Sequence, residues 1–272
     1  MASSSLTMLI SVDGMSSAGL AAADTPTIDG LRARGASTLM ARTVMPSVTL
    51  PCHTSMLRGV DVPRHGITTN TFAPLARPVP SLMDVAARSG LRVGAFYNWP
   101  ELRDLAEPGS VHVSYARSAC ETAEHDWAVA YAVSEHLAAE PFDLLFTYFG
   151  ATDSAGHEHG WMTPGYIAMI HNVDRCIAHV LDAARRMGRD VTVLVTSDHG
   201  GHGRTHGTDC DDDMRIPWVL AGPRVQQGLE LLTPVRGFDT CPTLAHCLNI
   251  AAAPQWDGRI IEEAFIPVAS AS

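Results

Sequence analysis

The stretch VTVLVTSDHGG at residues 191–201 decides the fold class. Its first six residues are β-branched or apolar, which indicates a strand buried in a sheet. The strand ends in Asp198-His199, and the two glycines that follow allow the backbone to turn sharply beside a bound group. Two other apolar runs end similarly, because 6–12 leads into Asp13 and 143–149 leads to Asp153. Ligands of parallel sheets bind beyond the carboxyl ends of the strands, so we expect these polar clusters to meet at one edge.

Strands and helices alternate along the chain. Further strands are expected at 37–44, 91–97 and 216–221, and helices at 27–34, 49–57, 81–89, 121–139, 163–187 and 239–248. This alternation predicts an α/β fold, a three-layer αβα sandwich with a mostly parallel central sheet. No repeat, low-complexity tract or interdomain linker interrupts the pattern, so residues 1–272 are predicted to form a single domain.

The composition is that of a globular protein with one large core, with 46% hydrophobic and 18% charged residues. The formal net charge of -10 disfavours nucleic acid polymers and anionic membranes as partners. The run Leu6–Val12 is too short for a signal peptide or a membrane span, which favours a cytoplasmic protein whose six cysteines are reduced. Nothing in the sequence indicates the oligomeric state.

Carboxylates and imidazoles lie at metal-ligand spacing after two of these strands. Asp198 and His199 are adjacent, and His206 follows close enough to reach a second ion. Asp153 and His157 are four residues apart and can bind one ion from a loop or a first helical turn. The alternatives are a polar turn with incidental histidines, solvated side chains and, for Asp13, an ordinary turn residue.

A hydroxyl stands at the start of the helix expected over 49–57. Thr49 and Pro51 occupy the positions of an N-cap and a first-turn proline. The free N–H groups and positive dipole of a helix N-terminus suit a phosphoryl group. Thr49 could therefore be a nucleophile activated by metal, a simple N-cap, or both.

The segments 49–53 (Thr-Leu-Pro-Cys-His) and 65–67 (His-Gly-Ile), together with Asn70, resemble the type I phosphodiesterase/nucleotide pyrophosphatase family of the alkaline phosphatase superfamily. The Asp13-Gly14 start and the later aspartates and histidines follow in the family's order, and 238–244 and 257–259 are similar to the end of superfamily members. The resemblance spans nearly the whole chain. It implies an alkaline phosphatase-like fold and a hydrolase that acts on small phosphoester substrates.

The resemblance also implies two Zn²⁺ ions, with Mn²⁺ or Fe as alternatives suggested by the oxygen and nitrogen ligands. The first ion would be held by Asp13, Thr49, Asp198 and His199, and the second by Asp153, His157 and His206. His202 competes with His206 for the last position. Asn70 would hold a non-bridging phosphate oxygen, and Thr49 would form a phospho-threonine intermediate.

The sequence departs from the family at Cys52, where asparagine is usual, and the chain is short for the family. The Thr49 and Asn70 motifs favour a phosphodiesterase, whereas His53 stands in place of the arginine of a sulfatase. A phosphomonoesterase or phosphonate hydrolase is the alternative activity, for which Arg58, Arg64 or Arg204 could supply the extra cation. A phosphate-moving isomerase and a non-catalytic metal-binding scaffold are the remaining alternatives.

Overall fold

The computed structural model describes residues 5–75 and 78–267, and its centre is one sheet in the order β4-β3-β5-β1-β6-β7-β2-β8. Strands β4, β3, β5, β1 and β6 are mutually parallel, whereas β7 runs antiparallel to both of its neighbours. The sheet is therefore mostly parallel, as the sequence predicts. The strands are β1 (Ser5–Val12), β2 (Ala36–Arg42), β3 (Val93–Tyr97), β4 (Val113–Ala116), β5 (Leu144–Phe149), β6 (Asp190–Thr196), β7 (Arg215–Ala221) and β8 (Leu229–Glu230).

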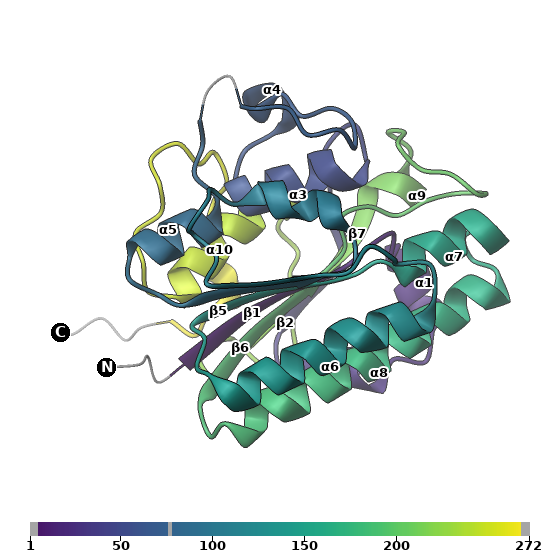
Figure 1. Cartoon of the computed structure of the whole chain (residues 1–272). Coiled ribbons are helices and arrows are strands. Elements are labelled where there is room, and N and C mark those ends of the chain that lie inside the picture. The colour runs from purple at the N-terminus through teal and green to yellow at the C-terminus, as the bar shows by residue number, and fades with distance from the viewer. Residues whose placement is uncertain (1–4, 76–77, 268–272) are drawn as a thin grey trace.

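Helices cover both faces of this sheet (Figure 1). One face carries α3, α5 and α10, and the other carries the long helices α6 and α8 with α1 and α2. This confirms the three-layer αβα sandwich. The helices are α1 (Ser17–Ala22), α2 (Pro26–Ala33), α3 (Thr49–Arg58), α4 (Val62–His65), α5 (Leu82–Arg88), α6 (Ala123–Ala139), α7 (Ala151–His159), α8 (Pro164–Arg186), α9 (Asp211–Met214) and α10 (Thr240–Cys247), with 3-10 turns at Pro100–Leu105, Gly237–Asp239 and Glu262–Ala264.

Strand β1 shows how the sequence builds two cores from one sheet. Successive strand residues point to opposite faces. Met8 and Ile10 are fully buried in the core under α6 and α8, whereas Leu9 is buried in the core under α3, α5 and α10. Burial on both faces explains why the central strands are continuous apolar runs rather than alternating ones.

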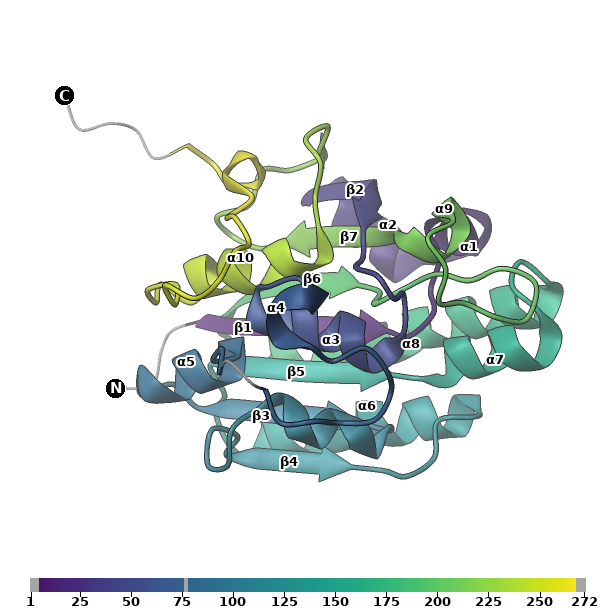
Figure 2. The same cartoon turned by 90° about the horizontal axis from the view of Figure 1, so that it is seen from above.

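The parallel strands all end at the edge of the sheet where α7 and α9 lie (Figure 2). The chain after β6 forms a loop and the short helix α9 at this edge. It then returns to the sheet as β7, which pairs with β6. Because the connection does not cross to the other end of the sheet, β7 must be antiparallel to β6.

The structure corrects one local prediction and adds elements that the sequence pattern did not indicate. Val48, with extended backbone, is the N-cap of α3, and Thr49 is the first helical residue, so Thr49 is not the cap. The added elements are short or polar, namely α1, α4, α7, α9, β4 and β8. Such elements carry little hydrophobic periodicity and are hard to recognise from sequence.

All six cysteines belong to the described residues, and each is a free thiol. Within the described ranges, the structure contains no helix with the length and apolarity needed to cross a membrane.

Candidate metal centre

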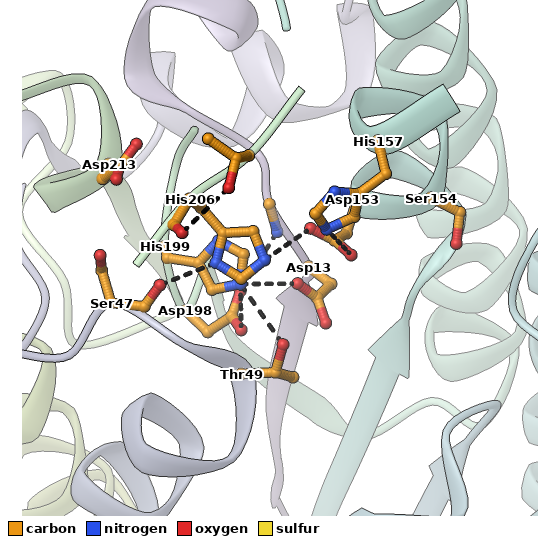
Figure 3. A network of polar contacts seen from close by, with 12 residues as sticks. Asp13, Ser47, Thr49, Asp153, Ser154, His157, Asp198, His199, His206 and Asp213 are labelled. Atoms are coloured by element: carbon orange, nitrogen blue, oxygen red, sulfur yellow. Dashed lines mark hydrogen bonds and ion pairs between the residues drawn. The ribbon is translucent and has the colours of Figure 1, made fainter. Parts of the chain in front are cut away.

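Four of the predicted residues meet where β1, β6 and α3 converge, and we call them the buried half-site: Asp13, Thr49, Asp198 and His199. Asp13 follows β1, Asp198 and His199 follow the adjacent strand β6, and Thr49 opens α3. The Nε2 atom of His199 lies 3.2 Å from Asp13 Oδ1, 3.4 Å from Asp198 Oδ2 and 3.4 Å from Thr49 Oγ1 (Figure 3). The fold thus brings together side chains that are up to 186 positions apart in the sequence numbering (199 − 13).

The other three predicted residues adjoin this cluster, and we call them the outer half-site: Asp153, His157 and His206. Asp153 and His157 lie one turn apart on α7, with His157 Nε2 3.4 Å from Asp153 Oδ2. His206 reaches in from the loop after β6, and its Nε2 atom lies 3.6 Å from Asp153 Oδ1. Asp153 is in the first turn of the helix, which is one of the two positions that the spacing allowed.

The two half-sites touch. The imidazole rings of His199 and His206 stack with centroids 3.8 Å apart, and ligand atoms of Asp153, His199 and His206 lie within 4.8 Å of one another. A second group at the same spacing is Asp13, Asp198 and His199. His157 adjoins the first group through Asp153 and through its ring, which lies 5.1 Å from that of His206.

The donor atoms of this cluster fit a cation. Asp13 Oδ1, Asp153 Oδ1 and Asp198 Oδ2 are buried and accept no hydrogen bond within the described structure. Each nevertheless lies within 3.6 Å of the Nε2 atom of His199 or His206, without hydrogen-bond geometry. Orphaned buried carboxylate oxygens are costly unless a cation satisfies them, and this combination of ligands is one that zinc accepts.

Electrostatics give the same indication. Burial, reinforced by the charge of Asp13, holds the pKa of Asp198 well above its ordinary range. Burial and then Asp13 raise the pKa of Asp153 to about 7. Burial acts in the same direction on Asp13, but the neighbouring His199 imidazole outweighs it and lowers the pKa to about 2. Three carboxyl groups thus compete for positive charge, and a bound cation would relieve that competition.

The three predicted histidines are all oriented in the same way. The Nδ1 atoms of His199, His157 and His206 donate to backbone carbonyls of Gly200, Arg204 and Ser47, at 2.8, 3.0 and 2.8 Å. Since a carbonyl can only accept, each Nδ1 carries hydrogen, and Nε2 is the atom that each ring would offer to a metal ion. In His199 burial opposes the charged ring, but Asp198 and Asp13 outweigh it and raise the pKa to about 10, so a metal ion would displace a proton from this Nε2. Burial also lowers the pKa of His206 to about 4, which favours the neutral imidazole that binds metal.

A second layer of residues holds the buried half-site in place. His53 Nδ1 donates to the Thr49 carbonyl at 2.8 Å, and its Nε2 atom lies 2.9 Å from Ser11 Oγ. Tyr148 donates to Asp13 Oδ2, and the Gly14 N–H donates to Asp198 Oδ1 at 3.2 Å. Sequence reasoning did not identify these supporting roles, although His53 stands four residues after Thr49, where a helix returns to the same face.

Two further predicted residues, Asn70 and Cys52, lie near the start of α3 but make different contacts. Asn70 Oδ1 accepts from the Leu50 N–H at 2.9 Å, so Asn70 lies at the N-terminus of α3. Cys52 points its thiol at the carbonyls of Val44 and Pro46, 3.9 and 3.6 Å away, rather than at the cluster.

The arginines considered for a monoester differ in their surroundings. Arg58 is buried and donates to the carbonyls of Val79 and Leu105, and Arg64 pairs with Asp257 at 3.6 Å. Both are therefore engaged elsewhere. Arg204 is exposed, and its carbonyl accepts from His157.

His202 does not share the position of His206. Its Nδ1 atom lies 2.7 Å from Asp213 Oδ1 and 3.6 Å from Cys210 Sγ, in a group that is separate from both half-sites.

Comparison with known proteins matches most of this chain to one family. The family model described as type I phosphodiesterase / nucleotide pyrophosphatase matches residues 7–207. Human ectonucleotide pyrophosphatase/phosphodiesterase family member 7 is 25% identical over 205 residues, which cover 65% of this chain and 43% of that protein. Arylsulfatase K of Danio rerio is 31% identical over 112 residues, covering 39% of this chain and 21% of that protein. The chain therefore matches less than half the length of these curated relatives.

Solved structures share the fold at low sequence identity. Murine ectonucleotide pyrophosphatase/phosphodiesterase 5, an inactive threonine-to-alanine variant in complex with AMP, superposes with a TM-score of 0.82 at 16% identity, covering 96% of this chain and all of that one. A 2-O GAG sulfatase superposes with a TM-score of 0.74 at 15% identity, covering 94% of this chain and 73% of that one.

Proposed function

Because the chain belongs to the type I phosphodiesterase/nucleotide pyrophosphatase family, we propose that it is a metal-dependent phosphodiesterase that works through a phospho-threonine on Thr49. The observation that carries the proposal is the place of the Thr49 hydroxyl. It stands at the first position of α3, 3.4 Å from His199 Nε2 and among carboxylates that each have one buried oxygen without a hydrogen-bond partner. A threonine with only a structural role in α3 would not need carboxylates and an imidazole around its hydroxyl.

The residues of the two half-sites would hold two ions, Zn²⁺ by ligand chemistry, with Mn²⁺ or Fe as alternatives. The buried half-site would hold one ion and the outer half-site the other. When bound, the ions would lower the pKa of the Thr49 hydroxyl and offset the negative charge of the reacting phosphoryl group.

The protein's own groups then orient the reaction. Thr49 Oγ1 attacks phosphorus and displaces one ester oxygen, which leaves as the alcohol or phosphate product, and water later cleaves the phospho-threonine. The His53 hydrogen bond to the Thr49 carbonyl fixes the backbone of the nucleophile. Asn70 uses its oxygen to bind the Leu50 N–H, so its amide NH₂ is left to donate to a non-bridging phosphate oxygen.

The basic residues favour a diester over a monoester. The extra cation that a monoester requires would have to be an arginine, because all 19 Lys and Arg residues of the sequence are arginines. Arg58 donates to the Leu105 carbonyl and Arg64 pairs with Asp257, so neither contacts the metal centre's ligands. The murine relative that binds AMP supports a substrate of nucleotide size, and we propose a small phosphoester rather than a nucleic acid polymer. We also propose that residues 1–272 act as one catalytic domain.

The test is hydrolysis of aryl phosphodiester and monoester substrates by the zinc-loaded chain, with Thr49→Ala and Thr49→Ser as paired variants. We expect diester turnover in the wild type, a loss of at least about 10³-fold in Thr49→Ala, and partial activity in Thr49→Ser, which keeps a hydroxyl. Zinc content measured beside activity shows whether the site survives each change. Full activity in Thr49→Ala would exclude the nucleophile, faster monoester turnover would favour the phosphatase alternative, and bound metal without turnover on either substrate would favour a scaffold.

A further inference from the structure

A third group of potential ligands lies on the loop that follows the metal centre: His202, Cys210 and Asp213. His202 Nδ1 lies 2.7 Å from Asp213 Oδ1 and 3.6 Å from Cys210 Sγ, and ligand atoms of all three fall within 4.8 Å of one another. The group shares no residue with either half-site. An imidazole, a thiol and a carboxylate in one place form a ligand set that zinc binds well.

The spacing is close to that of a tetrahedral site. Zn–S bonds of about 2.3 Å and Zn–N bonds of about 2.0 Å at tetrahedral angles place sulfur and nitrogen about 3.5 Å apart. Cys210 Sγ and His202 Nδ1 are 3.6 Å apart, which matches that edge. The nitrogen-to-oxygen edge should be about 3.3 Å. The 2.7 Å between His202 and Asp213 is a hydrogen bond in the metal-free geometry, and this distance would have to increase by about 0.6 Å.

The backbone around the group is held independently of any metal. Gly200 and Gly201 donate to the carbonyls of Asp213 and Asp212 at 2.8 and 2.9 Å, which ties the start of the loop to α9. Asp213 is fully buried, and its Oδ2 atom accepts from the N–H and hydroxyl of Thr208 at 2.8 and 2.7 Å. The carboxylate is thus already oriented, with Oδ1 directed at His202.

The other two ligands are accessible. The His202 side chain is 40% exposed, and Cys210 is partly exposed. An ion could therefore enter from solvent, and water could complete a fourth coordination position. A simple His202–Asp213 ion pair would not require a thiol within 3.6 Å of the same nitrogen, which is the feature that separates the two interpretations.

We propose that His202, Cys210 and Asp213 form a third, structural zinc site that closes the base of the loop carrying His206. The position of the group supports this role, because His202 and Cys210 flank the segment 203–209 and Asp213 lies on α9. A bond from the metal to each end would restrain the loop and hold His206 against Asp153. The site does not depend on the proposed phosphodiesterase activity.

The experiment is titration of the metal-free full chain with Co²⁺ alone, followed by the near-ultraviolet absorption of cobalt-bound thiolate. The two half-sites contain no sulfur ligand, so such absorption reports only a site that includes a cysteine. We expect it in the wild type and in Cys120→Ser, a control thiol near Ser154 on α7, and we expect its loss in Cys210→Ser. His202→Ala should weaken the Co²⁺ affinity of this band by about 10–100-fold.

Zinc stoichiometry gives a second readout. Cys210→Ser should bind about one Zn²⁺ fewer per chain than the wild type, and its Zn²⁺-dependent rise in melting temperature should be smaller. The proposal is overturned if saturating Co²⁺ gives no thiolate absorption in the wild type, or if Cys210→Ser keeps it undiminished. Failure of the proposed activity would look different, since the Co²⁺-loaded chain would then show the cobalt–thiolate band while the Zn²⁺-loaded chain showed no phosphodiester turnover.

Discussion

The two half-sites of the metal centre both contain carboxylates and imidazoles but differ in how the fold presents them. The side chains of Asp13, Asp198 and His199 are 3%, 0% and 0% exposed, whereas those of Asp153, His157 and His206 are 18%, 45% and 10% exposed. The buried half-site stands at the ends of two central strands and the start of α3, and the outer one on α7 and a loop. We infer that the sheet fixes the first and that the second is more adjustable.

The largest effect that tests this comparison is expected from His199→Ala. His199 Nε2 is central to the buried half-site, and its removal takes away the imidazole nitrogen that lies 3.2 Å from Asp13 Oδ1 and 3.4 Å from Asp198 Oδ2. Diester turnover should fall by about 10³-fold or more, and excess Zn²⁺ should not restore it because a buried cavity cannot re-form the ligand. Steady-state rates across a range of Zn²⁺ concentrations give the answer, and recovery at high Zn²⁺ would show that the buried half-site is no more rigid than the outer one.

A smaller and reversible effect is expected from His157→Ala. This exposed imidazole contacts the cluster through Asp153, so its loss should weaken one Zn²⁺ by about 10–100-fold while the other stays bound. Activity should therefore return when Zn²⁺ is raised. His159→Ala is the matched control, because His159 lies on the same helix with similar exposure and pairs with Glu158 instead. Equal losses in the two variants, or no recovery of His157→Ala, would contradict the assignment.

The same contrast explains what the sequence could and could not predict. Parallel strands end at one edge, so the sequence pattern alone groups Asp13, Asp153, Asp198 and His199, which all follow apolar strands. The helix that carries Asp153 and His157 has few apolar residues, so the pattern there predicts no more than a loop or a single helical turn.

The supporting residues were beyond the reach of the sequence pattern. Ser47 receives the His206 hydrogen bond through its backbone carbonyl, which leaves no mark on residue choice. Tyr148, which donates to Asp13, lies within an apolar strand and reads there as a core residue. Contacts of this kind depend on strand register, and the pattern of side chains does not reveal which hydroxyl faces which carboxylate.

The smallest expected effect concerns the scaffold beneath the buried half-site. His65 is buried, accepts from the Ile67 N–H at 3.0 Å through Nδ1, and lies 2.9 Å from Ser55 Oγ on α3, the helix that begins with Thr49. Burial lowers the pKa of His65 to about 4. A proton on Nδ1 would also break the Ile67 hydrogen bond, so the folded state disfavours the charged ring.

The sign of the pH dependence follows from this shift. Between about pH 6.5 and pH 4 the unfolded chain binds a proton at His65 that the folded chain does not, so the free energy of unfolding falls as the pH falls through that window. Above pH 6.5 the contribution is complete. His65→Asn should remove this part of the slope, on the order of 2 kcal/mol, in urea unfolding measured with chelator present so that metal release does not contribute. If the free energy of unfolding depends on pH equally in wild type and variant, His65 does not stabilise α3. The rigidity of the buried half-site would then have to come from the strand ends alone.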